Sequence, residues 1–185
     1  MSTGRKKRVS RAEWFEAAMR VLGDEGVKAV QIERLARDLG IAKSGFYWHF
    51  EDRRDLIRQL LDYWAHEYTE VLSENPELRD LDPKSRLLRV AEMVQDNDLS
   101  RYDRSFRAWA ARDAMVARHV DDVLRKRLDY VGQAFAELGF EGDELEMRTR
   151  LFVCYHSAET DIYSRVAKKR LRELLHLRVA LLTNR

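Results

Sequence analysis

The chain has 185 residues, of which 45% are hydrophobic and 36% are charged, and its net charge is +2 at pH 7. This composition allows a buried core in a soluble protein. A single cysteine, Cys154, excludes an internal disulfide framework, and no apolar run approaches the roughly 18 residues that suggest a membrane span. No apolar stretch follows the basic start, so we expect no signal peptide and a cytoplasmic location.

Charge is distributed unevenly along the chain. Residues 1–58 hold 13 Lys and Arg against 9 Asp and Glu, whereas residues 59–185 hold 21 against 23. A basic first third beside a mildly acidic remainder favours a polyanionic partner at the N-terminal end, although differences of this size are also common on solvated surfaces.

The first residues predict an arm followed by a helix. Residues 1–9 are basic and lack an apolar period, so we expect a disordered arm. Ser10 and Glu13 match the capping box that begins a helix, because their side chains can each accept an N–H near the helix start. Glycines at positions 23 and 26 end this helix. Its apolar residues recur at helical spacing: Phe15, Ala18 and Leu22.

Two short helices joined by a tight turn come next. The first fits residues 31–39, and Gly40 suits the left-handed conformation that ends a helix. The second covers residues 43–49. Two such helices around a glycine turn form a helix-turn-helix, whose second helix enters the major groove of DNA.

The rest of the chain predicts longer helices. A fourth helix runs without interruption over residues 52–75 and ends at Asn75-Pro76. Asp82 and Pro83 begin the next helix as its N-cap and first residue, and this helix continues to a polar stop at residues 96–98. Period-2 alternation is nowhere sustained, so the predicted fold class is all-α. Further helices are expected at residues 102–112, 115–138, 143–165 and 168–183.

The segment of residues 31–50, QIERLARDLGIAKSGFYWHF, contains the residue types that a DNA-reading helix-turn-helix needs. Small or polar residues at positions 42–45 allow the second helix to approach bases closely. Tyr47, Trp48 and His49 carry polar-tipped rings that can reach phosphate oxygens, and Arg53 lies at the positive end of the fourth helix. Apolar side chains fix the angle between the two helices: Ile32, Leu35, Leu39, Ile41 and Phe46.

On these residues the chain resembles the TetR family of transcriptional regulators. The stretch GIAKSGFYWHF at residues 40–50 is similar to the family's recognition-helix signature, and Asp52, Arg53 and Leu56 match the start of the helix that follows it. Upstream matches are Phe15, Ala17, Ala18, Gly26, Leu35, Ala36 and Gly40. The resemblance implies an N-terminal three-helix DNA-binding domain at residues 10–58 and a C-terminal helical domain at residues 59–185 for effector binding and dimerisation.

The signature and the residue types together predict the DNA contacts. Gln31 and Ala42 depart from the family, which usually has Ser or Thr helix caps there; an alanine cannot accept an N–H, which costs about 0.5–2 kcal/mol. Gln31 could instead touch phosphate, and Ala42 could present its methyl group to a thymine. The predicted contacts are Gln31, Ala42, Lys43, Ser44, Gly45, Tyr47, Trp48, His49 and Arg53.

Several of these residues have a structural alternative. Tyr47 and His49 could belong to the core of a small three-helix domain, and Trp48 could pack beneath the fourth helix. Arg53 is interpreted as a phosphate clamp and Arg54 as a solvated charge. The basic residues 5–8 form either a solvated tail or, in the sharper alternative, an arm that reaches the minor groove.

Aromatic residues cluster beyond residue 60, where most of them suit a helical core. The resemblance implies an effector pocket among the middle helices, and polar groups beside the aromatics could orient a ligand, among them Arg107, Arg112 and His119. The residues predicted to bind the effector are Phe106, Trp109, Tyr130, Phe152, Tyr155, His156 and Glu159. No metal site and no cofactor are predicted.

The last two helices carry apolar stripes that have two possible uses. The stripes are Leu151, Tyr155, Ala158 and Ile162, and then Leu171, Leu174, Leu175 and Leu182. They could complete the core of the monomer, whereas the resemblance implies a four-helix bundle shared with a second subunit. Two recognition helices about 34–36 Å apart would then read a palindromic operator. We expect a homodimeric regulator, in the repressor mode more common in the family, that a small-molecule effector releases by tilting the fourth helix.

Two other function classes are compatible with parts of the sequence. An effector-independent architectural DNA-binding protein would use the same helix-turn-helix, but about two-thirds of the chain lies beyond it, more than dimerisation requires. An enzyme could use Cys154, His156 and Glu159, but residues at positions i and i+2 of a helix face apart. A phosphate loop, paired metal-ligand spacing and a nucleophile elbow are missing from the sequence, which therefore predicts no enzyme.

Overall fold

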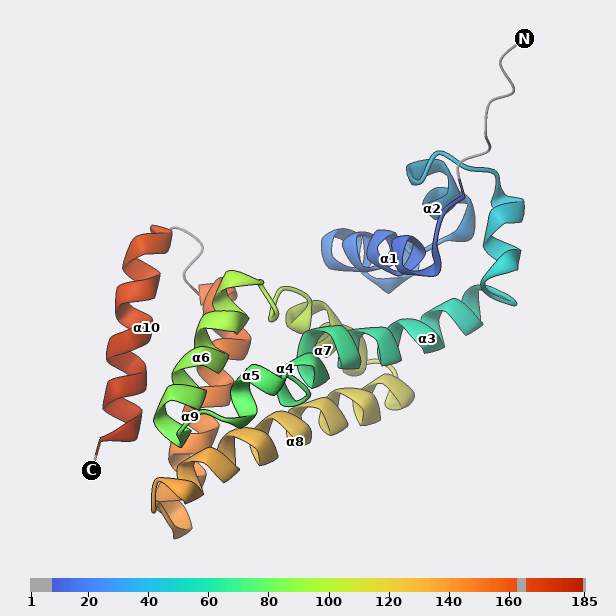
Figure 1. The fold of residues 1–185 in the computed structure, drawn as a ribbon. Coiled ribbons are helices and arrows are strands. Elements are labelled where there is room, and N and C mark those ends of the chain that lie inside the picture. The colour runs from blue at the N-terminus through green and yellow to red at the C-terminus, as the bar shows by residue number, and fades with distance from the viewer. Residues whose placement is uncertain (1–7, 163–165, 185) are drawn as a thin grey trace. The chain divides into compact units, whose positions relative to one another are not determined.

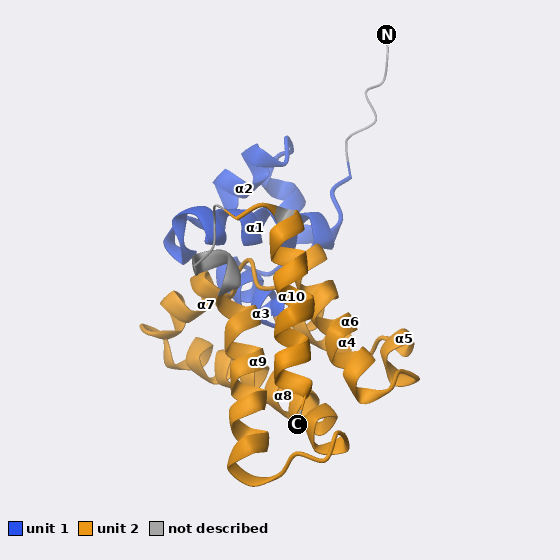
Figure 2. Cartoon of the chain, turned by 90° about the vertical axis from the view of Figure 1, so that its left-hand side faces the viewer, with its two compact units in different colours: residues 1–64 blue, residues 65–185 orange. Residues whose placement is uncertain are grey.

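The computed structural model describes residues 8–162 and 166–184, without the side chains of residues 159–162 and 168. These ranges contain helices, turns and loops but no strand, which confirms the all-α fold class (Figure 1). The chain divides into two compact units, residues 1–64 and residues 65–185 (Figure 2). The division falls six residues beyond the end of the DNA-binding domain predicted from the sequence.

The first unit consists of short helices around an aromatic core. Its elements are α1 (Arg11–Glu25), the 3₁₀ turn η1 (Val27–Ala29), α2 (Ile32–Asp38), the 3₁₀ helix η2 (Lys43–Trp48) and α3 (Arg53–Ala65), whose last residue belongs to the second unit. The predicted helix at residues 43–49 is therefore present, but as the tighter 3₁₀ form.

The capping box at the start of α1 is confirmed. The Ser10 hydroxyl accepts the Glu13 N–H at 3.2 Å, and the Glu13 carboxylate accepts the Ser10 N–H at 2.8 Å. Gly26, with φ +82°, ends the helix, so α1 continues through Gly23. The residues predicted to form its apolar stripe, Phe15 and Leu22 among them, are buried.

The turn between α2 and η2 depends on one glycine. Gly40 has φ +70°, a conformation that side-chain-bearing residues rarely adopt, and the Ile41 N–H returns to the Ala36 carbonyl at 3.0 Å. This closure is the left-handed helix ending that the sequence predicted at Gly40. It directs the chain into η2 at a fixed angle.

The predicted arm at residues 1–9 lies mostly outside the described residues, which begin at Arg8. Val9 belongs to the folded unit, because its side chain is only 4% exposed and its carbonyl lies 2.9 Å from His49 Nε2. The arm can therefore include at most residues 1–8.

The predicted fourth helix is not uninterrupted. After α3 the backbone widens into a π-helical turn, η3 (His66–Glu70), and then returns to α-helix in α4 (Val71–Ser73). A π-turn accommodates one extra residue and turns side chains to a new direction. Here it brings Thr69, 7% exposed, into the interior of the second unit.

The second unit is built from η3 and seven further helices within the described residues. Those beyond α4 are α5 (Pro76–Arg79), which the sequence did not predict, α6 (Pro83–Asp96), α7 (Asp103–Ala110), α8 (Ala114–Glu137), α9 (Gly142–Ile162) and α10 (Lys168–Thr183). Asp82 caps α6 through the N–H groups of Lys84 and Ser85, as the Asp82-Pro83 sequence predicts.

The core of the second unit lies between α6, α8, α9 and α10. Its buried side chains include Phe135 and Phe152, whose rings meet edge to face with centroids 6.1 Å apart. The long helix α8 packs against both α7 and α9. Helices from distant parts of the chain thereby pack around one hydrophobic core.

Candidate functional site

Phe46 anchors η2 to the rest of the first unit. Its ring is fully buried, and it lies 5.3 Å from the ring of Trp14 and 5.1 Å from that of Phe50. Leu35 of α2 and Leu39 at its end are also buried. The apolar residues predicted to hold η2 therefore pack inward, although Ile32 and Ile41 are only half-buried.

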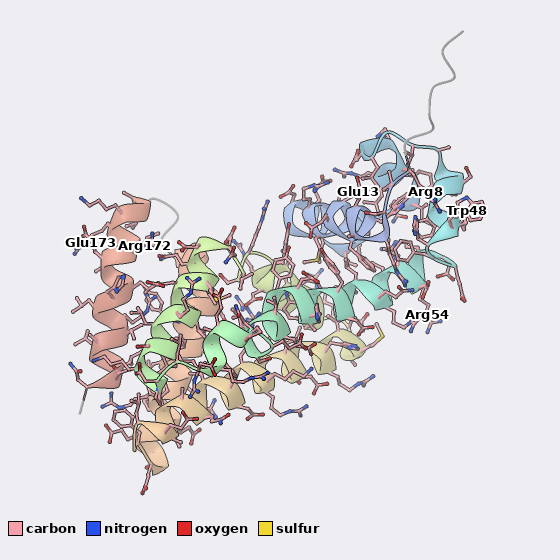
Figure 3. The ribbon with its side chains drawn as sticks, viewed as in Figure 1. Arg8, Glu13, Trp48, Arg54, Arg172 and Glu173 are labelled. Carbon is pink, nitrogen blue, oxygen red and sulfur yellow. The ribbon has the colours of Figure 1, made fainter. Side chains whose placement is uncertain are left out.

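The opposite side of η2 is open to solvent. Tyr47 is 55% exposed and Trp48 is 87% exposed, and Figure 3 shows Trp48 pointing away from the ribbon. We call the exposed residues of this segment the reading face: Ala42, Lys43, Ser44, Tyr47 and Trp48. The alternatives that placed Tyr47 in the core and Trp48 beneath the fourth helix do not hold in this structure.

Lys43 is already engaged by a neighbour on α2. Its ammonium group lies 2.5 Å from a carboxylate oxygen of Glu33, and both side chains are exposed. This contact raises the pKa of Lys43 and lowers the pKa of Glu33. A negatively charged partner of Lys43 would have to compete with Glu33.

The two departures from the family signature behave differently. Ala42 is the N-cap of η2 and provides no side-chain hydrogen bond, as its methyl group requires. Gln31 does not cap α2 either; its side-chain amide donates to the Lys28 carbonyl at 2.8 Å. Gly45 is half-buried, and a Cβ added there would lie only 3.1 Å from Cδ1 of Ile41.

His49 and Arg53 make contacts within the first unit. His49 Nε2 lies 2.9 Å from the Val9 carbonyl, so this nitrogen carries the hydrogen that the oxygen accepts. The Arg53 guanidinium donates to the Val30 carbonyl at 2.6 Å and to the Val27 carbonyl at 2.7 Å. The sequence suggested that Arg53 binds phosphate. In the structure its guanidinium instead stabilises the η1 turn.

Arg54 is the better-placed basic residue at the start of α3. It is exposed, and within the described part of the chain no hydrogen bond or ion pair engages it. Figure 3 shows it projecting from the ribbon. The sequence predicted a solvated charge at this position, which agrees with its exposure. The guanidinium is accessible to an anion that approaches this end of α3.

The second unit contains a cavity of about 580 Å³. Its walls come from η3 and α4, from α6 and the loop after it, and from α8 and α9. The apolar part of the lining consists of Leu72, Val90, Val94, Leu99, Val131, Phe152 and Val153, and the tyrosines are Tyr68 and Tyr130. A space of this volume with a mainly apolar wall has the dimensions of a small-molecule site.

Three of the residues predicted to bind an effector line this cavity: Tyr130, Phe152 and His156. Phe106 and Trp109 are not among its lining residues, because they are buried against each other with ring centroids 6.0 Å apart. Tyr155 is also absent from the lining, and its ring lies beneath the Arg178 guanidinium. The Glu159 side chain lies outside the described residues.

The polar centre of the cavity wall is Arg127, which is not among the residues predicted from the sequence. Its guanidinium forms a two-point ion pair with Asp103 and donates to the Thr69 hydroxyl at 2.9 Å. Its remaining N–H groups reach the Ser157 hydroxyl at 3.2 Å and the Tyr68 carbonyl at 3.3 Å. All five donors of this arginine are therefore used, and they connect α8 to α7, α9 and η3. Periodicity along the chain gives no sign of such a contact.

His156 is buried in the same wall and is uncharged. Its Nδ1–H donates to the Phe152 carbonyl at 2.7 Å, so Nε2 accepts from Arg178, 2.9 Å away. Burial, and then the positive charge of Arg178, lower the pKa of His156 to about 3. Cys154, two residues earlier, is exposed, so these two side chains face apart as the sequence predicted.

A comparison with protein families identifies the first unit. Residues 15–60 match the model of bacterial regulatory proteins of the tetR family, a range that includes most of α1, the turn at Gly40 and η2. These residues, about a quarter of the chain, resemble the N-terminal domain of that family. The resemblance stated on residues 10–58 is therefore confirmed.

The curated relatives that the chain matches are transcriptional regulators. The probable regulator ArpR of Pseudomonas putida is 34% identical over 93 residues, which are 47% of this chain and 44% of ArpR. The regulator TtgR of Pseudomonas putida is 33% identical over the same shares. The chain thus aligns with less than half the length of the curated relatives it matches.

The TetR-like fold extends over almost the whole chain. The regulator FadR of Bacillus subtilis, solved in complex with stearoyl-CoA, has a TM-score of 0.71 at 15% identity and is covered to 98%, with 95% of this chain aligned. Within the described residues no helix is long and apolar enough to span a membrane, and no group of side chains is arranged to hold a metal ion.

Proposed function

We propose that the protein is a homodimeric transcriptional repressor that binds a palindromic operator through the reading face and is released by a small molecule bound in the cavity of the second unit. The observation that carries this proposal is the division of η2 into two sides. Phe46 fixes the segment from within, while Tyr47 and Trp48 present their rings to solvent.

DNA binding is supported by the chemistry of the reading face and its surroundings. Ala42 and Ser44 are small enough for close approach to base edges, and Lys43 and the exposed Arg54 supply positive charge for bases and phosphates. The regulator BioQ, solved with its natural double-stranded DNA operator, has the same fold, with a TM-score of 0.54 at 20% identity over 95% of this chain and 98% of BioQ.

Dimerisation is supported by an apolar face on α9 and α10. Four large side chains there are exposed in the single chain: Met147 (57%), Leu151 (51%), Leu177 (55%) and Leu181 (68%). We call them the α9–α10 apolar face; the two helices lie side by side in Figure 2 and are joined where Arg178 meets His156. The sequence predicted an interface on these two helices, but of the four exposed residues only Leu151 belongs to the predicted stripes. A twofold partner would cover these residues, and two reading faces would give the specificity that one short helix lacks.

Release by an effector is supported by the cavity and its connection along the chain. Tyr68, Thr69 and Glu70 of η3 line the cavity, and η3 directly follows α3, the helix that begins at the reading end of the first unit. A ligand that prefers one arrangement of η3 would shift the population of DNA-binding dimers through its differential affinity. The cavity favours this function over that of an effector-independent architectural protein.

The DNA-binding part is tested by selection from a pool of random duplexes with the full-length protein. The proposal predicts that a palindromic sequence is enriched and that Tyr47→Ala binds it more weakly without loss of stability. Failure of the wild-type protein to enrich any duplex would refute DNA reading by η2.

The dimer is tested by sedimentation equilibrium of Leu177→Glu/Leu181→Glu. The proposal predicts dimers for the wild type and monomers for this variant. The matched control, Lys84→Gln/Arg118→Gln, changes the net charge by the same amount at exposed positions away from the apolar face and should remain dimeric. A dimeric Leu177→Glu/Leu181→Glu variant would contradict the proposed interface.

A further inference from the structure

The positive charges that line the cavity are already neutralised by the protein. All five N–H groups of Arg127 already donate hydrogen bonds. Two of these bonds go to the carboxylate of Asp103, whose side chain is only 3% exposed. Lys126 forms an ion pair with Glu70 on η3. Within the described residues these are the only Lys and Arg side chains in the lining. A ligand carboxylate or phosphate would therefore find no uncommitted cation.

Two lining carboxylates remain without a strong partner. Asp129 of α8 is exposed and has no hydrogen bond or ion pair among the described residues. Glu74, just after α4, has only His66, with 3.5 Å between the carboxylate oxygen and Nε2. Because both side chains reach solvent, they belong to the rim, whereas Val90 and Phe152 belong to the buried wall. The cavity thus combines an apolar interior with a negatively charged rim.

The aromatic lining suits the same ligand charge. Tyr68 and Tyr130 both contribute to the cavity surface, and the faces of tyrosine rings attract organic cations. His156 does not oppose this preference, because its low pKa keeps it neutral at pH 7.

From this balance of charges we infer that the cavity selects an amphipathic organic cation, with an apolar tail in the buried wall and a cationic head beside Glu74 and Asp129, in preference to an anionic ligand such as a fatty acid or an acyl thioester. The inference rests on the proposed function, since it specifies the effector of the same cavity. It separates this chain from its structural relative FadR, whose bound stearoyl-CoA is an anion.

The test compares three ligands that share one tail and differ in head charge: dodecyltrimethylammonium, dodecanol and dodecanoate. Each is titrated into the full-length protein by calorimetry below its micelle-forming concentration. The inference predicts that the ammonium compound binds about tenfold more tightly than dodecanoate, a ratio equal to about 1.4 kcal/mol. Glu74→Gln/Asp129→Asn should bring this ratio close to one and leave the affinity for dodecanol unchanged.

A matched control removes two exposed carboxylates that do not line the cavity. Glu77→Gln/Asp122→Asn changes the net charge by the same amount and should keep the wild-type ratio. If dodecanoate binds as tightly as the ammonium compound, or if the ratio survives in Glu74→Gln/Asp129→Asn, the charge inference is overturned while the effector cavity stands. If none of the three ligands binds, the charge inference and the effector part of the proposed function both fail, whereas DNA binding and dimerisation are decided by their own tests.

Discussion

The reading face and the cavity of the second unit use polar side chains in opposite ways. On the reading face Tyr47 and Trp48 are exposed, so that their rings can meet a partner. In the cavity wall Arg127 and His156 are satisfied internally, with every donor of Arg127 used and His156 held neutral between Phe152 and Arg178. The first arrangement suits recognition of a polar, charged surface, and the second suits a ligand that is mostly apolar.

The difference also lies in how each site is assembled. The reading face comes from one continuous stretch, residues 42–48, whose geometry follows from the glycine turn and one buried ring. The cavity needs side chains from segments between residues 68 and 157. A local site can be changed residue by residue, whereas the cavity depends on contacts that hold whole helices in place.

Phe46→Ala tests whether the reading face depends on its buried anchor. Loss of this ring from between Trp14 and Phe50 should reduce the free energy of unfolding of the first unit by about 3–5 kcal/mol, because a cavity replaces a fully buried side chain. Denaturant titration followed by circular dichroism measures this change. Tyr47→Ala is the matched control and should keep wild-type stability. Equal stabilities for the two variants would show that η2 is not held from within.

Asp103→Ala tests whether the cavity wall depends on its internal ion pair. It leaves the half-buried Arg127 without its counter-charge, so the free energy of unfolding of the second unit should fall by about 3 kcal/mol. Replacing both partners, as in Asp103→Leu/Arg127→Met, should restore most of this loss. A double variant less stable than the single one would contradict the idea that Asp103 serves mainly to neutralise Arg127.

His156→Gln tests whether the buried histidine of the cavity wall makes the stability of the second unit depend on pH. The folded-state pKa of His156 is about 3, below the value of 6.5 for a free histidine, so between these values only the unfolded chain binds a proton here. This contribution to stability is complete above pH 6.5 and is lost as the pH falls toward 3. Between pH 6 and pH 4 the wild type should therefore lose about 1.4 kcal/mol per pH unit more than the variant. Urea titrations over this range measure the two slopes, and parallel slopes would mean that His156 is charged or solvated in the folded protein.

Lys43→Ala and Arg54→Ala test which of the two basic residues contacts bases and which contacts phosphates. Lys43→Ala should alter preference among operator sequences by about 1 kcal/mol, whereas Arg54→Ala should weaken all duplexes alike and reduce the salt slope by about 1. Glu33→Gln frees Lys43 from its ion pair and should strengthen DNA binding. Fluorescence anisotropy at several salt concentrations provides these values. The assignment of Lys43 fails if its substitution weakens every duplex equally.

Sequence reasoning went furthest where structure is local. The capping box at Ser10, the left-handed turn at Gly40 and the inward position of Phe46 follow from side-chain chemistry a few residues apart, and the structure confirms each of them. The π-turn η3 was missed because helical periodicity over residues 52–75 does not reveal one extra residue per turn.

The residues of the reading face were easier to predict from the sequence than those of the cavity. Exposure of Tyr47 and Trp48 agrees with their predicted role, but Arg53 turns to backbone carbonyls 23 and 26 residues upstream, which sequence spacing cannot show. In the second unit Phe106 and Trp109 are core residues, while Arg127 and Asp103, 24 residues apart, meet only because α7 packs on α8. Long-range pairing of this kind needs the tertiary structure.

Tethered cleavage of DNA tests the position of η2 most directly. Ser44→Cys in a Cys154→Ser background allows an iron chelate to be attached at one exposed position of the reading face, and Ser85→Cys in the same background provides the control on the second unit. On the selected duplex the account predicts two clusters of strand breaks, symmetric about the centre of the palindrome, for the chelate at position 44 only. Uniform cleavage, or the same pattern from position 85, would contradict it.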